Sequence, residues 1–386
     1  RLDELLLVAT VWSPPKWMKT NNSTKKGGSL RPDRRAHFAK FLAAYCTGFE
    51  AVYGVPVFAL SIQNELEFVE PYNSCVYSPY SNDYAEAAAE VGRTFKRLGL
   101  PIKLFGPEHM CTDGAGGYRW TANSNHLARV MANPDAADAF LAWAFHGYAA
   151  DGQTVASAAK GWADYAVFAR RDGKQLWMTE TSGNPPEWIS TQRRRGGGQG
   201  RPNGVVTMAL NMHDALVYGD LHAWIYWSFQ DGSRVSQYNL TCKGNRTSKK
   251  LAVARHFFRY IRPGAVRIDA LPTSPEYPVC AFVHDGQKTL TVILGNQTAD
   301  KAEMRVSLRN IPEAPMAELA GFLTSADETW KALDRIRPDK GAFTVALPAH
   351  CVVTLVTAPP TNAAPQRTVQ AAPRPESPAP APVRTN

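Results

Sequence analysis

The segment VFALSIQNELEF, residues 57–68, carries the features that decide the fold class. Its apolar part, 57–62, has the length of a buried strand and ends directly in the polar triplet QNE, residues 63–65. A second strand is predicted at 175–178 (QLWM) and ends in the same way, in TET at 179–181. α/β enzymes place their chemistry at the carboxyl ends of parallel strands. The two predicted strands each bring one carboxylate, Glu65 or Glu180, to such an end.

Around this segment, apolar strands alternate with amphipathic helices as far as residue 262. The predicted strands are 5–10, 57–62, 103–105, 141–145, 176–178 and 223–227, and the predicted helices are 31–53, 83–98, 125–131, 136–141, 155–169, 204–216 and 250–261. Asp83 is expected to cap its helix and Gly99 to end it. The alternation predicts parallel βα units with right-handed crossovers.

Six such units are present, two fewer than a (β/α)8 barrel contains, and an open doubly wound sheet is the competing architecture. Long loops follow nearly every strand, and no glycine-rich phosphate loop is found. These two features favour a TIM-type (β/α)8 barrel that is two βα units short, residues 1–262.

A different pattern starts after Pro263. Short alternating runs recur at intervals of roughly ten residues, several of them separated by turn signals such as Asp285-Gly286. The predicted strands are 266–268, 279–284, 289–294, 302–308, 317–323 and 343–347. Residues 263–358 are therefore expected to form an antiparallel β-sandwich domain. The proline- and alanine-rich tail, 359–386, is expected to be disordered.

Composition narrows the class of protein. The chain has 386 residues, 44% of them hydrophobic, and a formal charge of +9. The basic clusters, such as 193–195, lie in polar loops rather than along one helix, which favours a solvated surface over nucleic-acid binding. Attraction of an acidic cell-surface polymer remains a lower-ranked alternative, and it requires binding that collapses with added salt. No apolar stretch is long enough for a membrane span.

The six cysteines form no C-x-x-C pair, which argues against a zinc cluster. Buried free thiols are favoured over one or two disulfides. The chain opens on Arg1 and enters a strand almost at once, without a recognisable signal peptide, so we expect a further segment upstream. We expect a secreted, periplasmic or cell-surface protein that is a monomer.

Glu65 and Glu180 are the candidate catalytic pair. Two carboxylates facing each other across a sugar bond are what glycoside hydrolysis requires, and in the retaining case they lie about 5 Å apart. Their environments must separate their pKa values, so that one carries a proton while the other stays ionised. The competing interpretation is an ordinary loop carboxylate, because loop glutamates are common here: Glu67, Glu70, Glu108 and Glu187.

Aromatic residues support a sugar-binding site, since apolar sugar faces stack on such rings. Those near predicted strand ends are Trp12, Trp17, Tyr148, Trp188, Trp224, Tyr226 and Trp227, of which at least two are expected to be core residues. His146 is expected to position a neighbouring carboxylate more readily than to act as a base or a metal ligand. No metal ligand set is recognised, and no G-x-S-x-G elbow of a serine hydrolase is present.

Several motifs then resemble glycoside hydrolase family 30 over roughly residues 5–357. They are WSPPKWMKTN (12–21), GGSLRP (27–32), SIQNE (61–65), GPE (106–108), HGY (146–148), WMTETSG (177–183), AWIYW (223–227) and RHFFRYIRPGAVRID (255–269). The resemblance implies that Glu65 is the acid/base and Glu180 the nucleophile. It also implies that Asn64 binds the sugar 2-hydroxyl and that Trp12, Tyr148 and Trp227 line the subsite of the cleaved sugar, with His146 in the same site.

Two departures from the family pattern stand out. The two βα units and the outer sandwich strand that precede the WSPP strand in the family are not found here, and Leu66 follows the acid/base where many relatives have proline. The sequence thus predicts a retaining β-glycoside hydrolase without cofactor, acting on a carbohydrate substrate. The alternative is a non-catalytic carbohydrate-binding protein with an incomplete barrel.

Overall fold

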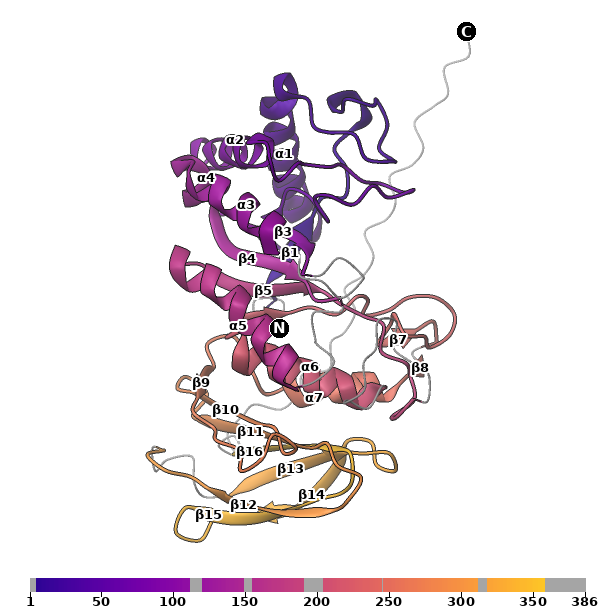
Figure 1. The fold of residues 1–386 in the computed structure, drawn as a ribbon, viewed down its shortest axis with the longest axis vertical. Helices are drawn as coiled ribbons and strands as arrows, with labels where there is room; N and C mark the ends of the chain where they lie inside the picture. The colour runs from indigo at the N-terminus through magenta and orange to yellow at the C-terminus, as the bar shows by residue number, and fades with distance from the viewer. Residues whose placement is uncertain are drawn as a thin grey trace.

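The computed structural model contains a parallel sheet with its helices and, packed against them, an antiparallel β-sandwich (Figure 1). The structure describes residues 5–111, 120–148, 155–190, 204–244, 246–311 and 318–357. The predicted disordered tail, 359–386, and the basic cluster 193–195 lie outside these residues.

The first part is a six-stranded parallel sheet whose spatial order follows the sequence. Its strands are β1 (Leu7–Thr10), β2 (Val57–Ser61), β3 (Lys103–Met110), β4 (Phe140–His146), β5 (Gln175–Glu180) and β6 (Ala223–Trp224). Every neighbouring pair is parallel. The prediction of six βα units is confirmed as a half-barrel, and within the described ranges no pairing joins β6 back to β1.

Helices cover this sheet because its strands are apolar on both faces, as is typical of parallel sheets. The helices are α1 (Arg35–Tyr53), α2 (Asp83–Arg97), α3 (Trp120–Met131), α4 (Pro134–Ala139), α5 (Val155–Asp172), α6 (Val205–Tyr218) and α7 (Lys249–Phe258). The largest core lies between sheet and helices, with Leu60 of β2 and Trp143 of β4 packed among Phe38 of α1 and Val91 of α2.

The predicted cap of α2 is wrong. Asn82 precedes the helix, and no side chain caps it. Asp83 is the first helical residue, and its carboxylate is bound by the Arg35 guanidinium of α1 and the Ser81 hydroxyl. Gly99, in contrast, follows the helix with a φ of 68°, the left-handed conformation that glycine adopts at helix ends.

The last predicted strand of the sheet is shorter than expected. Strand β6 ends at Trp224, although Ile225 N–H still donates to the Met178 carbonyl oxygen at 2.9 Å and Trp227 N–H to the Thr181 carbonyl oxygen at 2.8 Å. From Ser228 onward the backbone bonds instead to the segment 238–241, since Leu240 N–H donates to the Ser228 carbonyl at 3.0 Å. That change of partner takes the chain out of the parallel ladder and into the loop beside the pocket.

The second part is the predicted β-sandwich, with two more strands than predicted. Its strands are β9 (Val266–Ile268), β10 (Val279–His284), β11 (Thr289–Asn296), β12 (Ala302–Ser307), β13 (Leu319–Thr324), β14 (Lys331–Ile336), β15 (Ala342–Leu347) and β16 (Cys351–Thr357). The larger sheet has the order β14-β13-β16-β11-β10-β9, and β12 pairs with β15. The missed strand β16 is central and buried along its whole length, whereas the missed β14 is a mostly exposed edge strand.

Helices α6 and α7 lie between the parallel sheet and the sandwich (Figure 1). A second apolar cluster joins Val206 of α6 and Phe257 of α7 to Ile293 of β11 and Val352 of β16. The buried His256 ring of α7 is bonded to the Thr354 and Thr324 hydroxyls at 2.8 Å each. The predicted domain boundary at residue 262 thus falls between α7 and β9. Helices α6 and α7, before this boundary, share a continuous apolar core with the strands that follow it.

All six cysteines are described, and each is a buried free thiol, as favoured from the sequence. Among the described helices, none combines the length and apolar character needed to span a bilayer.

Candidate active site

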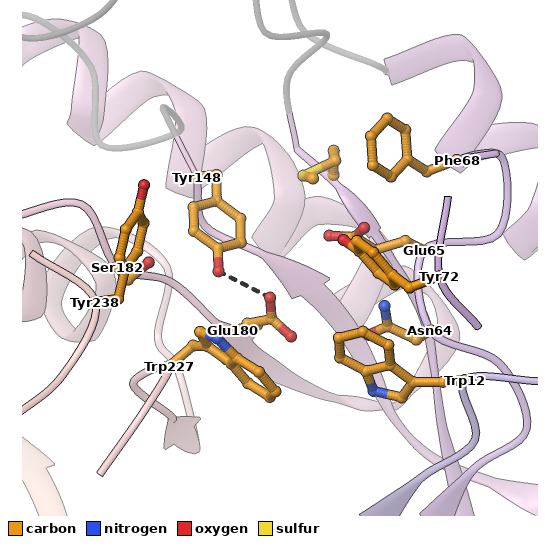
Figure 2. Close-up of a pocket in the computed structure, with 11 residues that line it drawn as sticks. Trp12, Asn64, Glu65, Phe68, Tyr72, Tyr148, Glu180, Ser182, Trp227 and Tyr238 are labelled. Carbon is orange, nitrogen blue, oxygen red and sulfur yellow. Dashed lines mark hydrogen bonds between the residues drawn. The ribbon is translucent and has the colours of Figure 1, made fainter. Parts of the chain in front are cut away.

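A pocket of about 290 Å³ lies at the carboxyl ends of β2, β4 and β5 (Figure 2). Its lining residues are Trp12, Asn64, Glu65, Phe68, Tyr72, Met110, Tyr148, Glu180, Ser182, Trp227 and Tyr238. All the predicted site residues except His146 are on this wall. The expectation that strand ends far apart in the sequence meet at one place therefore agrees with the geometry.

Glu65 follows β2 in a tight turn. Its φ of 47° lies in the left-handed region, which a residue with a side chain seldom adopts. The turn is held because the Glu65 N–H donates to the Glu108 carbonyl oxygen of β3 at 3.0 Å, and the Asn64 N–H donates to the Val11 carbonyl oxygen at 2.8 Å. The carboxylate points into the pocket while the residue is only 5% exposed. Unfavourable backbone conformations of this kind cluster at functional positions.

Glu180 is the last residue of β5, because the strand continues two residues beyond its predicted end at 178. The Tyr148 hydroxyl donates a hydrogen bond of 2.8 Å to its Oε1 atom (Figure 2). One potential ligand atom each of Glu65, His146 and Glu180 lies within 4.8 Å of the other two. The two candidate carboxylates therefore face each other at close range.

His146 is completely buried at the end of β4, under the two carboxylates. Its Nδ1 lies 3.0 Å from Glu65 Oε1 and 3.9 Å from Glu180 Oε1, and its Nε2 lies 3.9 Å from Glu108 Oε1. Burial by itself would lower the pKa of His146, but the flanking carboxylates of Glu108 and Glu65 outweigh it and raise this pKa to about 10. The structure thus places His146 as a cation that positions Glu65, and away from the pocket surface where a substrate would touch it.

The two carboxylates have different electrostatic surroundings. Burial would raise the pKa of Glu65, yet the hydrogen bonds from His146 and Glu70 lower it below its ordinary value. Burial raises the pKa of Glu180, against the opposing effects of the His146 charge and the Tyr148 hydrogen bond. In the free protein the shared cation therefore favours ionised Glu65 more strongly than ionised Glu180.

Aromatic rings form the rim of the pocket. The ring centroids of Trp12 and Trp227 are 5.5 Å apart, and Trp12 lies equally close to Tyr72. Trp227 is 42% exposed, and Figure 2 shows Trp12 and Trp227 on either side of Glu180. Exposed faces of this kind offer the apolar platforms on which sugar rings stack.

The other predicted aromatic residues lie elsewhere. Trp188 and Tyr226 are buried in the core that joins α6 and α7 to the sandwich, and Trp224 packs against the same core. Trp17 is exposed beside His37 and Arg34. The expectation that at least two of the seven were core residues is confirmed.

Several residues of the site could not be recognised from the sequence. Phe68 and Tyr72 come from the loop after β2, Ser182 follows β5, and Tyr238 comes from the loop after β6. Their signal in the sequence is their position in long loops after strand ends. Glu70 and Glu108 were counted as ordinary loop glutamates, but each is only 2% exposed: Glu108 lies in β3, and Glu70 bonds to Glu65.

Among the described residues, Glu65, His146 and Glu180 are the group whose spacing could hold a metal ion. The Nδ1 atom of His146 is 3.0 Å from Glu65 Oε1, a distance that a direct ion-paired hydrogen bond accounts for. The short distance between these two groups is thus explained by the residues themselves.

A parallel β/α sheet that presents two close glutamates at its strand ends, beneath a rim of tryptophan and tyrosine, is typical of enzymes that cleave glycosidic bonds. No protein-family profile matches the chain. In sequence it is similar to glucuronoxylanase XynC of Bacillus subtilis, with 22% identity over 355 residues that cover 91% of this chain and 73% of that protein. It is also similar to an endo-1,6-β-D-glucanase of Neurospora crassa, with 29% identity over 113 residues, 27% of this chain and 22% of that protein.

Solved structures share the fold. A glycoside hydrolase family 30 subfamily 8 xylanase, Xyn30A from Clostridium acetobutylicum, superposes with a TM-score of 0.71 at 24% identity, over 91% of this chain and 79% of that one. The endo-β1,6-glucanase BT3312 gives a TM-score of 0.68 at 17% identity, over 92% and 71% of the two chains. In fold, and more distantly in sequence, the chain is thus similar to glycoside hydrolase family 30 xylanases and to endo-β-1,6-glucanases.

Proposed function

We propose that this protein is a retaining β-glycoside hydrolase that cleaves a β-linked polysaccharide or glycoside by double displacement. The observation that carries the proposal is the short separation of Glu65 and Glu180, whose facing carboxylate atoms lie within 4.8 Å. Retaining enzymes place their two carboxyl groups about 5–5.5 Å apart, whereas inverting enzymes leave about 6.5–9.5 Å for a water molecule.

In this mechanism Glu180 attacks the anomeric carbon, and Glu65 protonates the departing glycosidic oxygen. Tyr148 donates to the nucleophile at 2.8 Å and so holds the orientation of its carboxylate. Once the glycosyl ester forms, the negative charge of Glu180 disappears, and Glu65 then takes a proton from the attacking water. Asn64, on the pocket wall beside Glu65, is in place to bind the sugar 2-hydroxyl.

The aromatic rim of the pocket supports a carbohydrate substrate. Trp12 and Trp227 supply stacking surfaces on both sides of Glu180, and no cofactor is needed for this chemistry. Xylan is the first polymer to test, because xylanases are among the related proteins, and β-1,6-glucan is the second.

The test compares the parent with Glu180→Gln and Glu65→Gln on aryl β-glycosides and on both polymers. Loss of general acid catalysis lowers rates by about 10²–10⁴-fold, so Glu65→Gln is expected to fall by this much on substrates with poor leaving groups. Glu180→Gln is expected to lose turnover altogether.

Glu187→Gln is the matched control, because Glu187 is an exposed loop glutamate outside the pocket. Proton NMR of the first-formed product reports the anomeric configuration, which should be retained. Equal activity in Glu180→Gln and the parent rejects the proposal that the protein is a retaining glycoside hydrolase with Glu180 as its nucleophile. Saccharide binding without release of reducing ends would instead identify a carbohydrate-binding protein.

A further inference from the structure

Glu70 belongs to the long loop between β2 and α2, and only 2% of the residue is exposed. Its backbone is fixed on both sides: its carbonyl oxygen accepts from the Lys26 N–H at 3.0 Å, and its N–H donates to Ser74 Oγ at 3.3 Å. Ser74 Oγ also accepts from the Gly27 N–H at 2.8 Å. Two loops therefore hold Glu70 in one position beside the pocket.

The Glu70 carboxyl group is hydrogen-bonded to the carboxyl group of Glu65. Two ionised carboxylates are both acceptors only, so this bond requires a proton on one of them. The charged and titratable groups that face Glu70 are Glu65, Glu180 and His146, together with Tyr72 from the same loop. Two of these neighbours are carboxylates, and the single cation, His146, is bonded to Glu65.

We propose that Glu70 is a positioning residue that shares one proton with Glu65 and so keeps the general acid supplied with the proton that it donates. This inference rests on the proposed function and deepens it. The electrostatics agree with the geometry. Burial, followed by the hydrogen bond and charge of Glu65 and the charge of Glu180, raises the pKa of Glu70 to about 9. The hydrogen bonds from His146 and Glu70 lower the pKa of Glu65 against the effect of its burial.

The proton balance of the reaction is consistent with this role. Before reaction, Glu65, Glu70 and Glu180 together hold one proton and two negative charges. When the Glu180 carboxylate forms its bond to the anomeric carbon and the glycosidic C–O bond breaks, the single shared proton passes through Glu65 to the leaving oxygen. Glu65 and Glu70 are then both ionised and Glu180 is an uncharged ester, so the total charge is unchanged.

The second half of the reaction reverses these transfers. Water attacks the glycosyl ester, its proton passes to Glu65 and on to Glu70, and Glu180 leaves as a carboxylate. The Glu180 charge is one cause of the raised pKa of Glu70. Its loss in the ester therefore favours proton release in the same step that needs the proton.

The first test is Glu70→Gln, whose amide keeps the size and a hydrogen-bond donor but has no transferable proton. We expect the alkaline limb of the kcat/KM profile to move to lower pH by at least about one unit, because Glu65 alone keeps a low pKa. On substrates with poor leaving groups kcat/KM should fall about 10–100-fold, whereas dinitrophenyl glycosides, which need little acid assistance, should be hydrolysed nearly as fast as by the parent.

Glu67→Gln is the matched control, since Glu67 lies in the same loop and binds His126 at 3.1 Å. Its alkaline limb should coincide with that of the parent. A purely structural role for Glu70 would instead lower the rates on both substrate classes at all pH values and leave the limb in place. That result overturns the proposal.

A second measurement does not depend on activity or on any change at Glu70. Infrared difference spectroscopy of the parent should show a protonated carboxyl group at pH 7 that ionises near pH 9. In Glu65→Gln this group should ionise at a lower pH, because the carboxylate that holds its proton is gone. An unchanged titration in Glu65→Gln, or no protonated carboxyl group at pH 7 in the parent, overturns the shared proton. An inactive parent rejects the proposed hydrolase and leaves this titration to decide the pairing of Glu70 with Glu65.

Discussion

At the scale of single residues, the site is organised around one buried cation. His146 lies between the two catalytic candidates and contributes to the lowered pKa of Glu65, while Tyr148 supplies the nucleophile with its own donor. Pocket residues at strand ends, such as Asn64, Glu65 and Glu180, could be read from the sequence because strand ends and motifs mark them. Glu70 and Glu108 could not, because nothing in a loop glutamate's local sequence shows that the folded chain buries it.

Tyr148→Phe is predicted to move the acid limb of kcat/KM to higher pH. The lost hydrogen bond favours the ionised form of Glu180, so its removal raises the pKa of that carboxyl further. Hydrogen bonds to charged groups contribute about 1.5–3 kcal/mol, which corresponds to a fall of about 10–100-fold in kcat/KM. Tyr226→Phe is the control, because the Tyr226 hydroxyl donates to the Gln237 carbonyl oxygen at 2.8 Å, away from both carboxylates. Coincident acid limbs in Tyr148→Phe and the parent would contradict the prediction.

At the scale of elements, strand β6 and helix α7 show how the sandwich and the pocket are connected. The chain leaves β6 after Trp224, forms the loop that carries Tyr238, and enters α7 after Ser248. Ser248 Oγ accepts from the Lys250 N–H at 3.2 Å, and Lys250 is itself buried against the Ser236 carbonyl oxygen. The start of α7 therefore holds the same loop that forms one wall of the pocket.

Ser248→Ala is expected to destabilise the protein by about 1 kcal/mol, because an N-cap side chain of this type contributes about 0.5–2 kcal/mol. Ser248→Asp should be at least as stable as the parent, since a carboxylate caps equally well and opposes the two lysines of the first turn. Urea unfolding at pH 7 measures both. If the alanine and aspartate variants unfold at the same urea midpoint, the N-cap side chain at position 248 does not contribute to the stability of the protein.

At the scale of the whole molecule, several buried titratable groups connect stability to pH. The folded-state pKa values of His146 and Glu70 are raised, from 6.5 to about 10 and from 4.5 to about 9. Their contributions are therefore complete below the unfolded-state values and are lost as pH rises. His256 has the opposite sign, because burial lowers its pKa to about 3, so stability is lost as pH falls below 6.5.

The free energy of unfolding is accordingly predicted to change little between about pH 4.5 and 6.5, where Glu70 and His256 act in opposite directions, and to fall between pH 6.5 and 8. In the second range the folded state holds extra protons on both His146 and Glu70, and each makes unfolding easier by about 1.4 kcal/mol per pH unit. Above pH 8 the buried Lys250, whose pKa is lowered to about 8, opposes this trend, so the window ends there. Urea melts at half-unit intervals measure the slope. In Glu70→Gln the slope should be shallower, and a flat parent profile would reject both raised pKa values.

The sequence by itself determined the order of strands and helices, the change to an antiparallel sandwich after Pro263, and the two glutamates at strand ends. Each of these depends on local periodicity and on turn residues, which the sequence displays directly. The folded structure alone reveals that Glu108 and Glu70 also surround those glutamates, and that α6 and α7 share a core with β16. Burial and electrostatic coupling depend on residues distant in the sequence, so they arise only when the strands and their loops are brought together.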